Sequence, residues 1–154
     1  YKFTTEPDRD VLAMNIIEEI NQKLPNTHLV MHGSSSVPKE LVDIINQYGG
    51  EIRPTFGVPV REIQEGIKHG VRKINVDTDL RLAMTGAVRE ALAADREDFD
   101  PRAYLKPARA KMQEVIAQRM VAFGQAGHAG DYEPIPLEEM AQRYTEAGHR
   151  LTVT

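Results

Sequence analysis

The amino-acid sequence predicts an α/β fold with parallel strands, and three observations support this prediction. Helical and strand-like segments alternate along the chain, in the order helix, strand, helix, short helix, strand, helix. Two short apolar runs end abruptly in polar clusters, at residues 30–36 and 73–79, as buried parallel strands do where they reach a functional site. Glycine and proline residues separate most of these segments.

The first part of the chain contains two predicted helices and one predicted strand. Asp10 is the expected cap of a helix over residues 11–24, where apolar side chains recur at helical spacing. Proline breaks this helix, and residues 28–31 form the first strand candidate. A second helix is expected after Ser36, its predicted cap, and it should stop at the glycine pair 49–50.

The second part of the chain is expected to hold one strand and four helices. The strand is expected at residues 71–76, and the helices at residues 60–69, 80–92, 100–123 and 136–147. Asp100 and Pro101 are expected to start the helix over residues 100–123. Because two strands alone cannot form a stable parallel sheet, we expect the chain to be the carboxyl-terminal part of a longer protein or to assemble with other pieces. The absence of an initiator Met favours the first alternative.

Composition excludes several classes of protein. The 154 residues suit one ordinary domain, and the net charge of −4 argues against nucleic acid as the main partner. The sequence has no apolar run near the ~20 residues that cross a bilayer, so we expect no signal peptide and no membrane partner. Cysteine is absent, which excludes disulfides and thiolate chemistry and fits a cytoplasmic location.

The two polar clusters favour a metal-assisted site for a phosphorylated substrate. The first cluster offers the imidazole of His32, then Gly33 and three consecutive serines. The second cluster offers the carboxamide of Asn75 and, at residues 77–79, two carboxylates and a threonine. Neutral imidazole is a zinc ligand, whereas small hydroxyl donors beside a helix N-terminus suit a phosphate.

Four segments together resemble one known family. They are residues 1–3, 32–36, 70–79 and 100–108. From Tyr1 to about Ala129 the chain resembles the carboxyl-terminal portion of class II, zinc-dependent fructose-1,6-bisphosphate aldolases, nearest the branch common in bacteria with the Calvin cycle. The family fold is a (β/α)8 barrel, so the resemblance implies that the two strands are the seventh and eighth. Residues 1–98 would then belong to the barrel, and residues 99–154 to a helical extension packed on the barrel or on a neighbouring subunit.

The resemblance also implies roles for individual residues. His32 matches a zinc ligand, and the family places two further histidine ligands and a catalytic aspartate before the position of Tyr1. Asn75 matches the residue that steadies the enediolate. The positions implied to bind the substrate phosphates are Lys2, Gly33, Ser34, Ser35, Asp77, Thr78 and Arg81. Arg81, implied to contact the distal phosphate, can also pair with Asp77 at the i,i+4 spacing, whereas Asp79 is expected to be a helix cap.

The function implied is zinc-dependent aldol cleavage of fructose 1,6-bisphosphate to dihydroxyacetone phosphate and glyceraldehyde 3-phosphate. The resemblance further implies a homodimer or homotetramer and allows a monovalent cation beside the zinc. Two alternatives stay open at this point: a tagatose-bisphosphate aldolase, and a phosphate-binding fragment without catalysis. The residue that transfers the proton cannot be named from these 154 residues.

Overall fold

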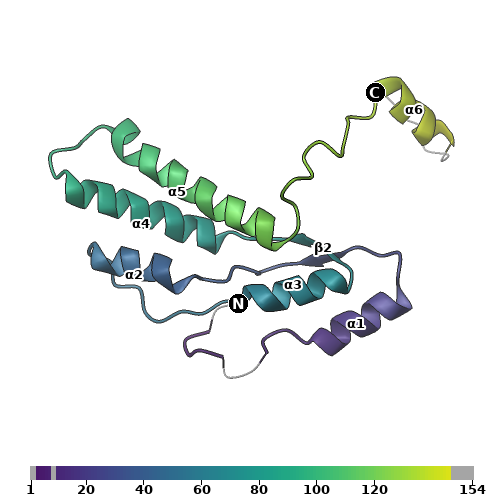
Figure 1. Cartoon of the computed structure of the whole chain (residues 1–154), viewed down its shortest axis with the longest axis horizontal. Helices are drawn as coiled ribbons and strands as arrows, with labels where there is room; N and C mark the ends of the chain where they lie inside the picture. The colour runs from purple at the N-terminus through teal and green to yellow at the C-terminus, as the bar shows by residue number, and fades with distance from the viewer. Residues whose placement is uncertain (1–2, 8–9, 147–154) are drawn as a thin grey trace, which may run out of the picture. The chain divides into compact units, whose positions relative to one another are not determined.

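The strands β1 (Leu29–Met31) and β2 (Val71–Ile74) form a two-stranded parallel sheet, as the sequence predicts (Figure 1). The computed structural model describes residues 3–7 and 10–146. Leu29 pairs with Val71 and Met31 with Ile74, and the register shifts once, just after Leu29. The parallel pairing confirms the α/β fold class and brings the carboxyl ends of both strands to the same edge.

The helices also follow the predicted order. They are α1 (Met14–Lys23), α2 (Lys39–Gln47), α3 (Val60–Lys68), α4 (Thr78–Ala94), α5 (Pro101–Ala122) and α6 (Leu137–Glu146). The chain divides into two compact units, residues 1–124 and 125–154. Within the first unit, α4 lies beside α5 and also packs against α2 (Figure 1). The predicted boundary between residues 98 and 99 stays a prediction, since α5 belongs to the same compact unit as α4.

Two clusters of buried apolar side chains hold the first unit together. One cluster surrounds the sheet and contains Met31, Val58, Ile63 and Val71. The other lies between α2, α4 and α5 and contains Leu41, Ala83 and Val115. Burial of such side chains is the main stabilising contribution to the fold.

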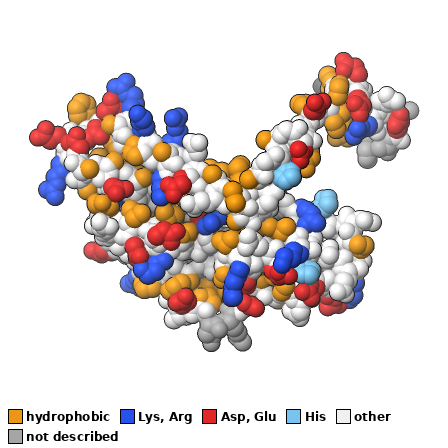
Figure 2. Space-filling model, in the orientation of Figure 1, with side chains coloured by type: hydrophobic (Ala, Val, Ile, Leu, Met, Phe, Trp, Pro, Cys, Tyr) orange, Lys and Arg blue, Asp and Glu red, His pale blue; other side chains and the backbone are white. Residues whose placement is uncertain are grey.

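Apolar side chains are also exposed on the first unit, and Figure 2 shows several of them on the visible face. Val30 of β1 is 49% exposed, and Ile116 and Met120 of α5 are 38% and 45% exposed. The predicted apolar stripe of α5 is therefore only partly covered within this unit, by contacts that bury Ala108 and Val115.

The start of α1 differs from the prediction. The helix begins at Met14, and Asp10 does not cap it; its carboxylate instead pairs with Arg61 at the surface. The backbone N–H groups of Val11 and Leu12 donate to Glu62 Oε2, at 2.9 and 2.8 Å. The buried Glu62, some fifty residues further along the chain, therefore holds residues 11–12, for which a helical turn was predicted.

The start of α5 agrees with the prediction. The carboxylate of Asp100 accepts a hydrogen bond from the backbone N–H of Arg102 at 2.9 Å, and the Arg102 guanidinium also donates to it. The side-chain hydrogen bond from Arg102, followed by the backbone bond, lowers the pKa of Asp100 below its usual value. The ionised form of Asp100 is therefore the one that the folded protein favours.

We expect Asp100→Ala to lower the midpoint of thermal unfolding by a small amount that depends on pH. A carboxyl with a lowered pKa in the folded state stabilises the protein above its unfolded-state pKa, about 3.9, and loses that effect as pH falls through the folded-state value. The difference between wild type and Asp100→Ala should thus be constant from about pH 7 to 5 and shrink toward pH 3. Asp100→Asn is the control, because it keeps a cap acceptor without titrating. A difference that stays unchanged down to pH 3 would contradict the account.

The second unit, residues 125–154, contains α6 in its described part. Side-chain pairs four residues apart, Arg143 with Glu139 and Gln142 with Glu146, line this helix. None of its described side chains is buried. Among the described residues of the whole chain, no helix has the length and apolar character needed to span a membrane.

Candidate functional site

The polar clusters at the ends of the two strands lie together, as the sequence predicts. Backbone pairing continues beyond the sheet: Asn75 N–H donates to the carbonyl of Met31 at 3.0 Å, and Ser34 N–H donates to the carbonyl of Asn75 at 3.3 Å. These two bonds align residues 32–36 with residues 75–79 along one edge. The arrangement is the one in which α/β proteins bind ligands, at the carboxyl ends of parallel strands.

His32 and Asn75 are in direct contact. Nδ2 of Asn75 lies 2.8 Å from Nδ1 of His32, and the Lys73 ammonium donates to Oδ1 of Asn75 at 2.5 Å. With the amide nitrogen as donor, Nδ1 of His32 accepts and the ring proton resides on Nε2. Lys73 was not singled out from the sequence, because nothing in the alternation of β2 shows that its side chain reaches back to Asn75.

His32 fits one ligand of a metal site. Its side chain is exposed at the strand end, and Nε2 has no hydrogen-bond partner among the described residues. A metal at Nε2 would need the ring proton on Nδ1, and Asn75 would then have to present its amide oxygen to that nitrogen. The described residues contain no group of three or more His, Cys, Asp or Glu side chains that could hold a metal ion. Further ligands would therefore come from elsewhere.

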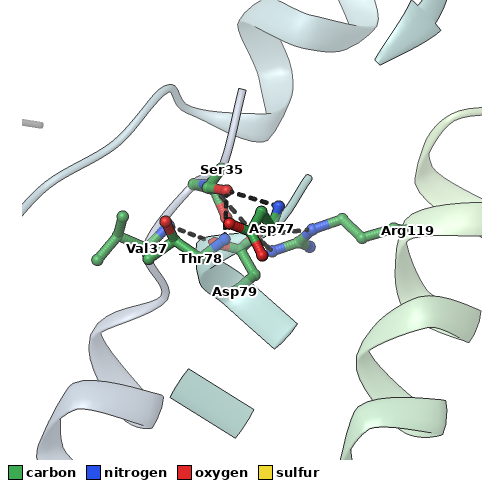
Figure 3. A network of polar contacts seen from close by, with 7 residues as sticks. Ser35, Val37, Asp77, Thr78, Asp79 and Arg119 are labelled. Atoms are coloured by element: carbon green, nitrogen blue, oxygen red, sulfur yellow. Dashed lines mark hydrogen bonds and ion pairs between the residues drawn. The ribbon is translucent and has the colours of Figure 1, made fainter. Parts of the chain in front are cut away.

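Ser35 joins the first cluster to the start of α4. Its Oγ accepts hydrogen bonds from the backbone N–H groups of Asp77, at 3.1 Å, and Thr78, at 3.0 Å (Figure 3). These are N–H groups that the first turn of a helix leaves without an intrahelical partner. A serine hydroxyl that accepts two bonds still has its own proton to donate. Ser35 can therefore donate to a ligand oxygen at a place where the helix N-terminus favours negative charge.

Two glycines shape the backbone around Ser35. Gly33 has φ +65°, a left-handed conformation that glycine adopts without strain. At Gly57, a Cβ would lie 2.1 Å from the carbonyl oxygen of Ser35, so no larger residue fits there. The next residue, Val58, donates its N–H to that same carbonyl at 3.1 Å. Gly57 was missed in the sequence because it lies in a predicted loop with no other signal of function.

Asp79 has a different role from the predicted helix cap. It is the second residue of α4 and is completely buried, and its Oδ1 accepts a hydrogen bond from Val37 N–H at 2.8 Å. Its Oδ2 accepts from the backbone N–H and the hydroxyl of Ser36, at 3.2 and 3.1 Å. The predicted cap role of Ser36 is also wrong, since Pro38 precedes α2 and no side chain caps that helix.

Arg119 completes this buried network and was not identified from the sequence. Its guanidinium reaches from α5 to Oδ2 of Asp79 at 3.0 Å and to Oγ of Ser36 at 2.7 Å (Figure 3). It lies within an apolar stripe of α5, where an arginine reads as an ordinary surface residue. Its position among apolar residues was the only sign in the sequence that Arg119 is not an ordinary surface residue. Its buried acidic partner, Asp79, is 40 residues away and is found only in the structure.

The remaining predicted site residues are placed as follows. Arg81 Nε donates to Asp77 Oδ1 at 2.9 Å, which confirms the predicted i,i+4 pair, and both side chains are exposed. Ser34 is buried, and its hydroxyl donates to the carbonyl of His32 at 3.4 Å. Lys2 lies outside the described residues. The roles predicted for these residues toward a substrate stay predictions.

Comparison with known proteins gives one consistent result. The model of the family described as class-II fructose-bisphosphate aldolase matches residues 1–128. Among similar proteins, a fructose-bisphosphate aldolase of Nostoc sp. is 58% identical over 146 residues, which are 95% of this chain and 41% of the relative. Fructose-bisphosphate aldolase 2 of Cereibacter sphaeroides is 58% identical over 144 residues, or 94% of this chain and 41% of the relative. A fructose-bisphosphate aldolase of Pseudomonas aeruginosa is 56% identical over 144 residues, again 94% of this chain and 41% of the relative. The chain thus spans about two fifths of the length of these relatives.

Proposed function

This chain belongs to the class-II fructose-bisphosphate aldolase family, and on that premise we propose that it forms part of an enzyme that cleaves fructose 1,6-bisphosphate. The products would be dihydroxyacetone phosphate and glyceraldehyde 3-phosphate. The observation that carries the proposal is the contact between Nδ1 of His32 and Nδ2 of Asn75, which lie 2.8 Å apart at the carboxyl ends of the parallel strands. Ser35 and the start of α4 lie beside this contact. A metal ligand, an amide donor and a phosphate site are three of the elements that this reaction needs, besides a residue that transfers the proton.

The chemistry requires that negative charge be stabilised on the substrate. Cleavage of the carbon–carbon bond β to a ketone leaves an enediolate. A bound zinc ion would supply Lewis acidity that polarises the ketone oxygen. In this proposal His32 holds the zinc together with ligands outside the described residues, and the residue that transfers the proton also lies elsewhere in the protein.

Asn75 would hold the substrate oxygen whose charge grows during the reaction. A carboxamide N–H donates to that oxygen without adding a full charge to the site. With zinc on Nε2 of His32, the Asn75 amide would present Oδ1 to Nδ1–H of the imidazole, so Nδ2 would leave its present contact and become available to the substrate oxygen.

The phosphate nearer the ketone would bind beside the start of α4. Gly33 lets the backbone approach, Ser35 donates its hydroxyl proton, and Ser34, Thr78 and Lys2 are the other proposed contacts from this chain. The Asp77 carboxylate would repel a phosphate, but Arg81 pairs with it at 2.9 Å and offsets that charge. Arg81 is also the proposed contact to the distal phosphate.

The assembly and location of the protein complete the proposal. We place it in the cytoplasm as a homodimer or homotetramer, with a monovalent cation allowed beside the zinc. The exposed apolar side chains of α5, including Ile116 and Met120, offer a surface that the rest of the protein or a second subunit would cover.

The test uses the protein expressed from its complete gene. We expect it to cleave fructose 1,6-bisphosphate, to lose that activity with a chelator, and to regain it when Zn²⁺ is added back. Tagatose 1,6-bisphosphate should be cleaved with a kcat/KM lower by at least about tenfold, the scale of one misplaced polar contact. Cleavage of neither ketose bisphosphate by the zinc-loaded protein would leave only phosphate binding and would reject the enzyme. Preference for the tagatose compound would reassign the substrate.

A further inference from the structure

Residues 33–37, which carry several of the proposed phosphate contacts, are fixed by hydrogen bonds to the buried carboxylate of Asp79. Asp79 has no exposed surface, and it accepts three hydrogen bonds from Ser36 and Val37, at 2.8, 3.1 and 3.2 Å (Figure 3). Ser36 and Val37 follow directly on Ser35. A change in the position of Asp79 would therefore move the serine that lies beside the start of α4.

The same segment contains a strained residue. Val37 has φ +53°, in the left-handed region that β-branched residues rarely adopt. Such a conformation persists only where the surroundings hold it. The hydrogen bond from Val37 N–H to Asp79 Oδ1, at 2.8 Å, holds this peptide in place. Val37 is also buried, so packing around its side chain adds to the restraint. The chain turns here from the serines into α2.

Asp79 in turn depends on Arg119. The guanidinium lies 3.0 and 3.3 Å from Oδ2 of Asp79 and donates to the Ser36 hydroxyl at 2.7 Å, with 16% of its side chain exposed. A buried carboxylate without a cationic partner is strongly unfavourable, so removal of Arg119 should displace Asp79 from its present position. That displacement would weaken the hydrogen bonds that Asp79 accepts from Ser36 and Val37.

We propose that Arg119 is a positioning residue, which acts through Asp79 to fix residues 33–37 in the conformation that binds the substrate phosphate. This rests on the proposed aldolase function. Arg119 touches no substrate in this account. It ties α5, the last helix of the first unit, to the proposed phosphate site, so that the packing of α5 on α4 also sets the geometry of that site.

The experiment compares four variants of the protein expressed from its complete gene. Arg119→Met removes the charge, Arg119→Lys keeps it without the two-pronged contact, and Ser36→Ala removes one hydroxyl while Asp79 and Arg119 remain paired. Arg109→Met is the matched control, because Arg109 lies on the same helix with an exposed side chain. The measurements are kcat and KM for fructose 1,6-bisphosphate, the Kd of inorganic phosphate, and the unfolding midpoint.

We expect Arg119→Met to raise KM and the phosphate Kd by about tenfold or more, with a smaller loss of kcat, as for lost ground-state binding. Arg119→Lys should recover part of this loss, Ser36→Ala should shift both constants in the same direction by less, and Arg109→Met should match wild type. If Arg119→Met does not fold, the lysine and Ser36→Ala variants decide. A lower unfolding midpoint with unchanged KM and phosphate Kd would overturn the proposal.

The two proposals can fail separately. If wild type cleaves the bisphosphate and the Arg119 variants keep its KM and phosphate Kd, the positioning role is wrong and the aldolase function stands. If wild type cleaves neither ketose bisphosphate, the aldolase function is wrong. The phosphate Kd still tests the inference in that case, because weaker binding in Arg119→Lys supports it and unchanged binding refutes it.

Discussion

Replacing His32 with alanine should abolish aldol cleavage and leave the fold intact. His32 is exposed at the end of β1, and its described side-chain contact is the hydrogen bond to Asn75, so its loss creates no buried cavity. Mutation of residues that merely support metal ligands typically lowers metal affinity or activity by about 10–100-fold. Loss of a ligand itself should therefore lower kcat/KM by more than about 100-fold. Metal analysis should show less bound zinc, and the unfolding midpoint of the metal-free protein should be close to that of metal-free wild type.

His28→Ala is the matched control for this experiment. His28 is also an exposed histidine, placed just before β1 rather than after it. The variant should retain full activity and full zinc content. The assignment of His32 as a ligand is wrong if His32→Ala keeps activity within a few-fold of wild type and binds as much zinc.

The fold class could be predicted because its signals are local. The apolar runs that became β1 and β2, and the helical spacing of α3 to α5, depend on neighbouring residues alone. The helix α5 starts at Asp100 and Pro101 as predicted, and the hydrogen bond that caps it joins Asp100 to Arg102, only two residues on. Local patterns thus determined which elements form and nearly where each begins.

The wrong capping predictions have a common cause. Asp10 and Ser36 have the residue types that cap helices, but their side chains are engaged by distant partners. Asp10 pairs with Arg61, and the Ser36 hydroxyl binds Asp79 and Arg119. Sequence position alone does not show that such partners are near, so the tertiary contact prevails over the local preference.

In the candidate site, too, residues placed by local pattern could be predicted, whereas a residue placed by a distant contact could not. His32, Ser35 and Asn75 could be placed together because parallel strands share an edge, and this needs no knowledge of other contacts. Arg119 could not be placed, since it reaches Asp79 across 40 residues through the packing of α5 on α4. The residues that we propose to contact a ligand lie mainly at the strand ends, where the sequence pattern points to them, whereas a positioning residue such as the one proposed here can come from any element that packs nearby.

Replacing Asn75 with alanine should lower kcat by on the order of 10²-fold or more, the scale of losing one donor to a developing oxyanion. KM should change much less, because an interaction that strengthens only in the transition state affects kcat rather than ground-state binding. Ser35→Ala provides the contrast: it removes a donor to a phosphate that is held throughout the reaction, and it should mainly raise KM. Steady-state kinetics on fructose 1,6-bisphosphate distinguishes the two patterns.

The contact between Asn75 and His32 complicates Asn75→Ala, because the imidazole also loses a partner at Nδ1. Asn75→Asp separates the two effects. Its carboxylate can accept from Nδ1–H and keep the ring in place, but it offers no N–H to the substrate and adds negative charge beside the enediolate. We therefore expect Asn75→Asp to retain zinc and still lose kcat at least as severely as Asn75→Ala. If both variants change only KM, or if zinc loss accounts for the whole effect of Asn75→Ala and Asn75→Asp is active, then Asn75 binds or supports the site and does not stabilise the developing charge.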